Sequence, residues 1–208
     1  MIAVVMCGGK GTRMDDFTKI EKPLRMVLGK TLIEYVVDAL IASLQFERVI
    51  VVPSPNTPMT REFVYDNYGS FYNIKVIESA GMGYSFDLMR LVEYLRPSKL
   101  FFLGADLPFI NAKIIKKIVT NCPKDAPCIS VILEKKFVES IGIKPSVIIC
   151  EDNVDYCHSG ITVIDSSGVK HKNQGLSECY LLMNEKEIAI NVNTKKDLEL
   201  ANRSYNRN

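Results

Sequence analysis

The chain has 208 residues, of which 47% are hydrophobic and 24% are charged, as in an ordinary globular domain. Its 26 basic and 24 acidic residues give a net charge of +2, which supplies no field that would indicate a nucleic-acid or membrane-surface partner. No apolar run is long enough to predict a membrane span, and no basic stretch precedes the first apolar run as in a signal peptide. The six cysteines form no Cys-x-x-Cys pair, so we expect reduced thiols, a cytoplasmic location and a single domain over residues 1–208.

In the first half of the chain, short apolar stretches alternate with amphipathic ones. The expected strands are 2–6, 48–52, 74–77 and 100–103, each apolar in the manner of a parallel sheet that is covered on both faces. The expected helices are 32–44, 58 to about 67, 83 or 85 to about 95, and about 111 to 120. Thr31 and Glu34 form a capping box for the first helix, and Thr57-Pro58 is a strong start for the second. This alternation predicts right-handed βαβ units and an α/β fold with a mostly parallel sheet.

The second half of the chain is richer in short strands. The expected strands are 128–133, 146–149, 160–164 and 188–192. Residues 134–180 hold most of the irregular sequence, and we expect them to form a β-rich excursion over one end of the sheet. A last helix is expected from 195 to about 203, where Thr194 and Asp197 form a second capping box.

A glycine-rich loop follows the first predicted strand. Its stretch Gly8-Gly9-Lys10-Gly11 allows the backbone to turn several N–H groups toward one point. Lys10, Arg13 and Lys22 add positive charge around that point. The loop has neither the Gly-Lys-Ser/Thr of a P-loop nor the Gly-x-Gly-x-x-Gly spacing of a dinucleotide fingerprint. It therefore predicts a different type of phosphate site, and the alternative is a tight turn surrounded by solvated charges.

A carboxylate follows the fourth predicted strand, in the sequence Gly104-Ala105-Asp106-Leu107-Pro108. Ligands of open α/β sheets bind outside the carboxyl ends of the strands, where both Asp106 and the glycine loop are expected to lie. Mg²⁺ prefers one or two carboxylates together with phosphate oxygens. Asp106 is therefore predicted to bind Mg²⁺, and the alternative is a residue that only stabilises the turn before Pro108.

Two asparagines near the end of the chain form a third candidate site. Asn191 and Asn193 occupy alternate positions of a predicted strand, so their side chains are expected to point the same way. Their carbonyl oxygens can complete a metal shell or bind a ribose or an acceptor without adding charge. The alternative is that Asn193 and Thr194 only cap the last helix, although that would leave Asn191 in an apolar strand unexplained.

These motifs together resemble a known superfamily. The loop 8–14 with Glu21-Lys22-Pro23, the aspartate Asp106 and the stretch 191–194 look like the signature of the Rossmann-like nucleotidyltransferases. That superfamily includes sugar-phosphate nucleotidyltransferases and the molybdenum-cofactor guanylyltransferases. The resemblance implies a Rossmann-like sheet flanked by helices, of the nucleotide-diphospho-sugar transferase type.

A narrower resemblance covers almost the whole chain. The segments 54–58, 81–84, 158–161 and 191–198 are similar to those of the archaeal GTP:adenosylcobinamide-phosphate guanylyltransferases. Three segments depart from that family: 15–20 is longer, 106–109 looks more like the molybdenum-cofactor branch, and roughly 123–157 matches neither. The family implies GTP and a corrinoid phosphate as substrates, Mg²⁺ as cofactor, and a homodimer.

The reaction that the resemblance implies is attack by the acceptor's terminal phosphate on the α-phosphorus of GTP. Such a phosphate is already ionised near neutral pH and needs no general base, so catalysis depends on positioning and charge neutralisation. The implied catalytic residues are Lys10, Arg13, Lys22 and Asp106, with Asp106 also the metal ligand. The implied nucleotide-binding residues are Gly8, Gly9, Gly11, Thr12, Ser54, Asn56, Thr57, Gly81 and Gly83. The implied acceptor-binding residues are Gly160, Asn191 and Asn193.

Some of these assignments, and the function itself, have alternatives. Thr57-Pro58 is also an ordinary helix start, and Gly160 is also typical of a β-turn or bulge. The acceptor could instead be molybdopterin, phospholactate or a sugar phosphate. A nucleotide-binding regulatory module without turnover is a further alternative, although such a module has less need of a metal-binding carboxylate.

Overall fold

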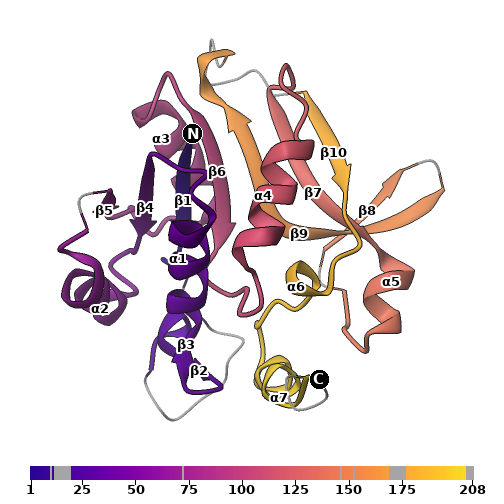
Figure 1. Cartoon of the computed structure of the whole chain (residues 1–208), viewed down its shortest axis with the longest axis horizontal. Helices are drawn as coiled ribbons and strands as arrows, with labels where there is room; N and C mark the ends of the chain where they lie inside the picture. The colour runs from indigo at the N-terminus through magenta and orange to yellow at the C-terminus, as the bar shows by residue number, and fades with distance from the viewer. Residues whose placement is uncertain are drawn as a thin grey trace.

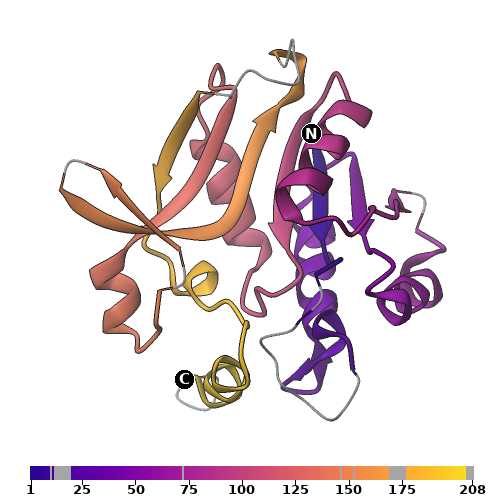
Figure 2. The same cartoon turned by 180° about the vertical axis from the view of Figure 1, so that it is seen from behind.

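The computed structural model of the chain describes residues 1–9, 11, 20–71, 73–145, 147–151, 153–168 and 177–204. In this part a mixed sheet runs through the molecule and has helices on both faces (Figures 1 and 2). Its strand order is β10-β7-β9-β6-β1-β4-β5, and β8 pairs with β9. Among the described residues, no helix has both the length and the apolar composition needed to cross a membrane.

The first half of the chain forms the parallel part of this sheet. Its strands are β1 (Ile2–Met6), β4 (Arg48–Val52), β5 (Ile74–Val76) and β6 (Lys99–Gly104). Its helices are α1 (Leu32–Ser43), α2 (Pro58–Tyr68), α3 (Tyr84–Tyr94) and α4 (Ala112–Asn121). The strand order changes direction at β1, which lies between β4 and β6, and in this register Met6, Val52 and Gly104 end side by side. A ligand site is expected beside such a point.

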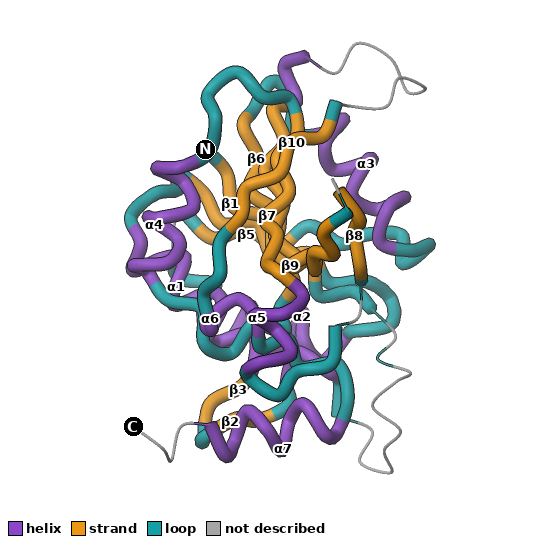
Figure 3. Tube along the Cα trace, turned by 90° about the vertical axis from the view of Figure 1, so that its right-hand side faces the viewer, coloured by secondary structure: helices purple, strands orange, loops and turns teal. Residues whose placement is uncertain are grey.

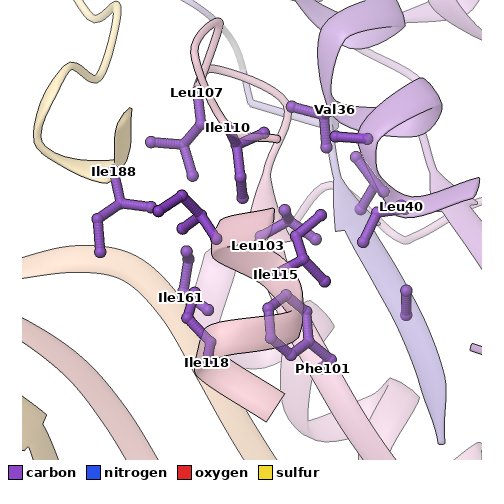
Figure 4. Close-up of a cluster of buried hydrophobic side chains, with 14 of the residues drawn as sticks. Val36, Leu40, Phe101, Leu103, Leu107, Ile110, Ile115, Ile118, Ile161 and Ile188 are labelled. Carbon is purple, nitrogen blue, oxygen red and sulfur yellow. The ribbon is translucent and has the colours of Figure 1, made fainter. Parts of the chain in front are cut away.

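The core explains why the parallel strands are apolar throughout. Alternate side chains of a strand point to opposite faces of the sheet, and both faces of β1 are covered. Ala3 and Val5 belong to a cluster with α1 and α4, whereas Ile2 and Val4 pack in a second cluster with α3 on the other face. Figure 4 shows the first cluster continuing toward the second half of the chain.

The second half of the chain extends the sheet through an antiparallel strand. Its elements are β7 (Cys128–Glu134), α5 (Lys135–Ser140), β8 (Ile148–Glu151), β9 (Val154–Asp165), the short 3-10 turn η3 (Ser166–Gly168) and β10 (Glu178–Leu182). β9 lies between β6 and β7 and is antiparallel to both, whereas β10 is parallel to β7. Phe102 of β6 pairs with Thr162 of β9, so residues just before Thr162 reach the level of the carboxyl end of β6. This is how Gly160 comes to lie near the point where β1 and β6 end.

Short elements complete the fold near the same end of the sheet. They are the 3-10 turn η2 (Lys22–Leu24), the hairpin of β2 (Met26–Val27) and β3 (Lys30–Thr31), and the helices α6 (Lys186–Ala189) and α7 (Lys195–Ser204). Figure 3 shows α7 lying against the β2–β3 hairpin. Val27, Val192 and Ala201 form part of a small buried cluster there, which ties the segment before α7 to the segment after η2.

Most of the predicted elements are confirmed. The α/β class, the four parallel strands, helices α1 to α4 and both capping boxes, at Thr31 with Glu34 and at Thr194 with Asp197, occur within a residue or two of prediction. The strand predicted at 146–149 is β8, which begins and ends two residues later, and the one predicted at 160–164 is the longer β9.

The strand predicted at 188–192 is wrong. Ile188 and Ala189 belong to α6, and residues 190–194 belong to no strand. The physical reason is that β6 already pairs with β1 on one side and β9 on the other, so its edges are filled. Just beyond the end of β6, the segment makes a backbone hydrogen bond from Val192 N–H to the Asp106 carbonyl oxygen at 2.9 Å. Residues 134–180, expected as an excursion, include α5, β8 and β9, and β9 lies inside the sheet.

Candidate functional site

A cavity of about 780 Å³ lies where β1 and β6 end side by side. The predicted site residues that line it are Gly8, Gly9, Gly11, Lys22, Asn56, Gly81, Gly83, Asp106, Gly160, Asn191 and Asn193. These residues follow β1, β4, β5 and β6 or come from β9 and the segment before α7. The fold therefore brings the glycine loop, the aspartate and the asparagine pair to one place. Three further predicted residues of the glycine loop, Lys10, Thr12 and Arg13, lie outside the described residues.

Ser54 and Thr57 are buried, and neither is among the described residues that line the cavity. Ser54 Oγ donates to the Gly8 carbonyl oxygen at 2.7 Å and accepts from Asn56 N–H at 3.0 Å. Thr57 Oγ1 in turn accepts from Ser54 N–H at 3.0 Å. The two hydroxyls therefore join the loop after β4 to the loop after β1, and in this geometry they hold the cavity wall in place.

A lysine, an aspartate and two asparagines form a connected polar network in the cavity. Lys22 Nζ donates to Asp106 Oδ2 at 2.5 Å and to Asn193 Oδ1 at 2.9 Å. Asn193 Nδ2 donates to Asn191 Oδ1 at 3.0 Å, so the two asparagines lie together as predicted although the segment is not a strand. The side chains of Lys22 and Asp106 are 17% and 19% exposed, which places a cation and an anion together at the cavity wall with little solvent screening.

Gly104 allows Asp106 to take this position. A Cβ atom on Gly104 would lie 2.6 Å from Asp106 Oδ1, so the carboxylate folds back over the end of β6 into space that only glycine leaves free. The sequence signal was present, as a glycine two residues before the predicted metal ligand, but its reason is visible only in the folded chain. One carboxylate and nearby amide oxygens beside an open cavity match the donors that Mg²⁺ takes together with phosphate oxygens and water. The donor set at Asp106 therefore fits Mg²⁺.

Glu21 was part of the motif, but its role was not predicted. Its carboxylate accepts hydrogen bonds from Met59 N–H, Thr60 N–H and Thr60 Oγ1 at 2.8, 2.7 and 2.6 Å. These groups belong to the first turn of α2, so Glu21 caps that helix from outside. Thr57 occupies the N-cap position of α2 and Pro58 begins the helix, as predicted, but the Thr57 hydroxyl is bonded to Ser54 and makes no capping hydrogen bond. Glu21 thereby anchors the neighbouring residue Lys22 in the cavity.

Replacing Glu21 with alanine is expected to lower the free energy of unfolding by about 1–3 kcal/mol, since three hydrogen bonds to one carboxylate are lost at a helix start. Urea denaturation measures this change. Glu62, an exposed carboxylate on the same helix, supplies the control, because Glu62→Ala should change the value by less than about 0.5 kcal/mol. Equal effects of the two substitutions would show that Glu21 does not cap α2.

His158 also lines the cavity and was not assigned a role from the sequence. Gly160 N–H donates to His158 Nδ1 at 2.8 Å, which fixes this nitrogen as an acceptor. Gly160 has a φ of +84° and lies where β9 and β7 shift register, so the bulge alternative describes its backbone. A Cβ on Gly160 would meet Asn191 Nδ2 at an ordinary 3.7 Å, so backbone conformation is what requires glycine in the free protein.

Burial lowers the pKa of His158, against a smaller raising effect of Glu178. The folded protein therefore disfavours the imidazolium. The contribution of His158 to stability is fully present when the pH is above the ordinary histidine pKa near 6.5, and it is lost as the pH falls below that value. We expect the free energy of unfolding of wild type to fall between about pH 7.5 and about pH 5.5 by more than that of His158→Asn, whose amide oxygen can accept from Gly160 without titrating. If the free energies of unfolding of the two proteins changed equally with pH, burial of a neutral His158 would be contradicted.

The fold and this cavity define a class, that of α/β proteins that bind a phosphate-bearing ligand at the carboxyl ends of parallel strands. Residues 3–149 match the model of the MobA-like NTP transferase domain. The chain belongs to the MobA-like NTP transferase family.

Individual relatives agree with that assignment. The chain is 34% identical over 207 residues to adenosylcobinamide-phosphate guanylyltransferase of Methanocaldococcus jannaschii, a match that covers 97% of this chain and 95% of that protein. Its fold is similar to a hypothetical transferase from Thermus thermophilus, with a TM-score of 0.70, 15% identity, and coverage of 95% of this chain and 98% of that one. It is also similar to 4-diphosphocytidyl-2C-methyl-D-erythritol synthase from Anaerococcus prevotii, with a TM-score of 0.68, 15% identity, and coverage of 99% and 98%. At 15% identity, these two structures show a similarity of fold alone.

Proposed function

We propose that this protein transfers GMP from GTP to adenosylcobinamide phosphate and releases pyrophosphate, a step of cobalamin biosynthesis. The observation that carries the proposal is the similarity, over 97% of the chain, to the M. jannaschii adenosylcobinamide-phosphate guanylyltransferase. The cavity supports it, because a glycine loop, a lysine and a carboxylate meet there at the carboxyl ends of two parallel strands.

The chemistry requires positioning more than proton transfer. An oxygen of the acceptor phosphate forms a bond to the α-phosphorus of GTP, and the bond from that phosphorus to the bridging oxygen of the β-phosphate breaks. The bridging oxygen leaves with the electron pair, as part of pyrophosphate. The second pKa of a phosphate monoester is near 6, so the nucleophile is largely ionised at neutral pH and needs no general base.

The role of each residue follows from its position around the cavity. Backbone N–H groups of the loop that contains Gly8 and Gly9 would hold the triphosphate, and Lys22 would offset charge as pyrophosphate leaves. The acceptor phosphate would approach from the side of Gly160 and Asn191, which lie across β6 from the loop after β4. Lys10 and Arg13, as members of the same loop, remain predicted partners of the triphosphate.

Magnesium is part of the proposal. Asp106 would hold the ion, and the amide oxygens of Asn191 and Asn193, which belong to the same polar network, could add neutral donors. The ion supplies neutralisation of phosphate charge in the transition state. Lys22 pairs with Asp106 in the structure, so this lysine can keep the carboxylate neutralised and can also turn to the phosphates.

Pyrophosphate release tests the proposal. The protein is incubated with each of the four nucleoside triphosphates and with adenosylcobinamide phosphate, molybdopterin, phospholactate or a sugar phosphate. Release that needs both GTP and adenosylcobinamide phosphate is expected. Release with another acceptor would reassign the substrate, a possibility raised by 106–109, and no release with any acceptor would favour the nucleotide-binding module. A cytoplasmic location and a homodimer remain predictions.

A further inference from the structure

Asp87, in the first turn of α3, is a buried carboxylate with an unused oxygen. Asp87 is 6% exposed to solvent. Oδ2 accepts from Gly81 N–H at 3.2 Å, whereas Oδ1 is buried and has no hydrogen-bond partner among the described residues. A buried acceptor left without a donor costs about 1–3 kcal/mol, and more when it is charged. A ligand that brings N–H donors to Oδ1 would remove that cost.

The position of Asp87 shows where such a ligand would lie. Asp87 lines the main cavity and also a side cavity of about 290 Å³, and Ser79 is the other residue that lines both. The main cavity holds the Lys22–Asp106 pair, so a nucleotide whose phosphates lie there has room for its base at the boundary of the two cavities. In the sheet order, β4 and β5 lie on the opposite side of β1 from β6, which Asp106 follows, and from β9, which contains Gly160.

The loop before α3 is packed closely against the loop after β4. Gly81 has a φ of +69°, and a Cβ there would lie 3.0 Å from Asn56 Nδ2 and 3.3 Å from Ser54 Cβ. The loops after β4 and β5 are therefore packed closely together. The hydrogen bond from Gly81 N–H fixes the orientation of the Asp87 carboxylate between them.

We infer that Asp87 recognises guanine, with its carboxylate accepting hydrogen bonds from the N1–H and N2–H groups of the base. This inference rests on the proposed function, in which GTP is the substrate. A carboxylate has two oxygens and about four acceptor sites, so Oδ2 keeps Gly81 N–H while both oxygens accept from the base. Adenine presents an acceptor at N1, which would face the carboxylate unfavourably. A site that is built for donors rejects a base that lacks them, because its buried oxygen stays unpaired.

Equilibrium binding of GTP, inosine triphosphate and xanthosine triphosphate tests the inference, because it does not depend on the acceptor. Inosine triphosphate lacks the N2 amino group, so wild type is expected to bind it about tenfold to a hundredfold more weakly than GTP. Asp87→Asn keeps the shape of the side chain and presents one acceptor and one donor. That pair matches the N1–H and the C2 carbonyl of xanthine, so this variant should favour xanthosine triphosphate over GTP.

The controls separate recognition from support of the loop. Asp66→Asn changes an exposed carboxylate on α2 and should leave all three affinities unchanged. If Asp87 only anchors Gly81, the Asp87→Asn protein would lose affinity for the three nucleotides equally and keep its preference for GTP, which would overturn the inference. Equal binding of GTP and inosine triphosphate by wild type would overturn it without any variant. Failure of the proposed function looks different, since wild type would then discriminate between the bases but transfer nothing to the corrinoid.

Discussion

Asp106→Asn is expected to lower the rate of guanylyl transfer by at least about a hundredfold in the presence of Mg²⁺, while the protein stays folded. Asparagine has the size of aspartate and its amide oxygen can still accept from Lys22, so the space that Gly104 leaves free remains filled. What is lost is the negative charge that would hold the metal ion next to the phosphates. Steady-state pyrophosphate release with saturating substrates measures the effect.

Binding of GTP without Mg²⁺ separates this role from a general loss of the site. In wild type Lys22 is paired with Asp106, so loss of the negative charge weakens the hold on the lysine, and the affinity for metal-free GTP should not fall. Asp155→Asn supplies the control, because it breaks the ion pair between Asp155 and Lys135 outside the cavity and should leave turnover unchanged. A folded Asp106→Asn protein with nearly wild-type turnover would show that Asp106 does not hold the metal.

Gly8→Ala is expected to lower the free energy of unfolding by about 1–3 kcal/mol and to weaken GTP binding by a similar free energy, or roughly 5- to 150-fold. A Cβ on Gly8 would lie 2.7 Å from Ser54 Cβ and 3.2 Å from Ser79 Oγ, so one of the facing loops must move. That movement also breaks the hydrogen bond from Ser54 Oγ to the Gly8 carbonyl. Urea denaturation and titration calorimetry give the two values.

Two further variants show whether the clash is the cause. Gly9→Ala places a Cβ in open space and is the control for stability, which it should leave within about 0.5 kcal/mol. Ser54→Gly removes the atoms that the new methyl group would meet, so the double variant with Gly8→Ala should be more stable than the sum of the two single changes predicts. Additive effects would mean that Gly8 and Ser54 are not in the contact that the structure shows.

Local sequence patterns predicted the parallel part of the fold well. A strand such as β1 is apolar at every position because both of its faces are buried, and the capping boxes at Thr31 and Thr194 each depend on residues three apart. The glycine loop and Asp106 could be placed at neighbouring strand ends for the same reason, since the strand–helix alternation determines where they point. These features need no information from distant parts of the chain.

The features that were missed depend on contacts between distant segments. Glu21 caps a helix that begins 37 residues later, and no pattern near Thr57 shows that its hydroxyl is already bonded to Ser54. The segment around Asn191 has the apolar pattern of a strand, but β6, whose end it adjoins, already pairs with β9 and β1. Asp87 was not predicted for a similar reason. An aspartate in the first turn of a helix is common, and the sequence does not show that the loop containing Gly81 packs against this one.

The measurement that tests the central claim most directly follows the phosphates of GTP. Wild-type protein is given adenosylcobinamide phosphate, Mg²⁺ and GTP labelled with ³²P at either the α- or the γ-position. The account predicts that the α-label moves into the corrinoid product and that the γ-label appears in pyrophosphate, in equal amounts and only when the corrinoid is present. Transfer of the γ-label to the corrinoid, or loss of pyrophosphate from GTP at the same rate without it, would contradict guanylyl transfer in this cavity.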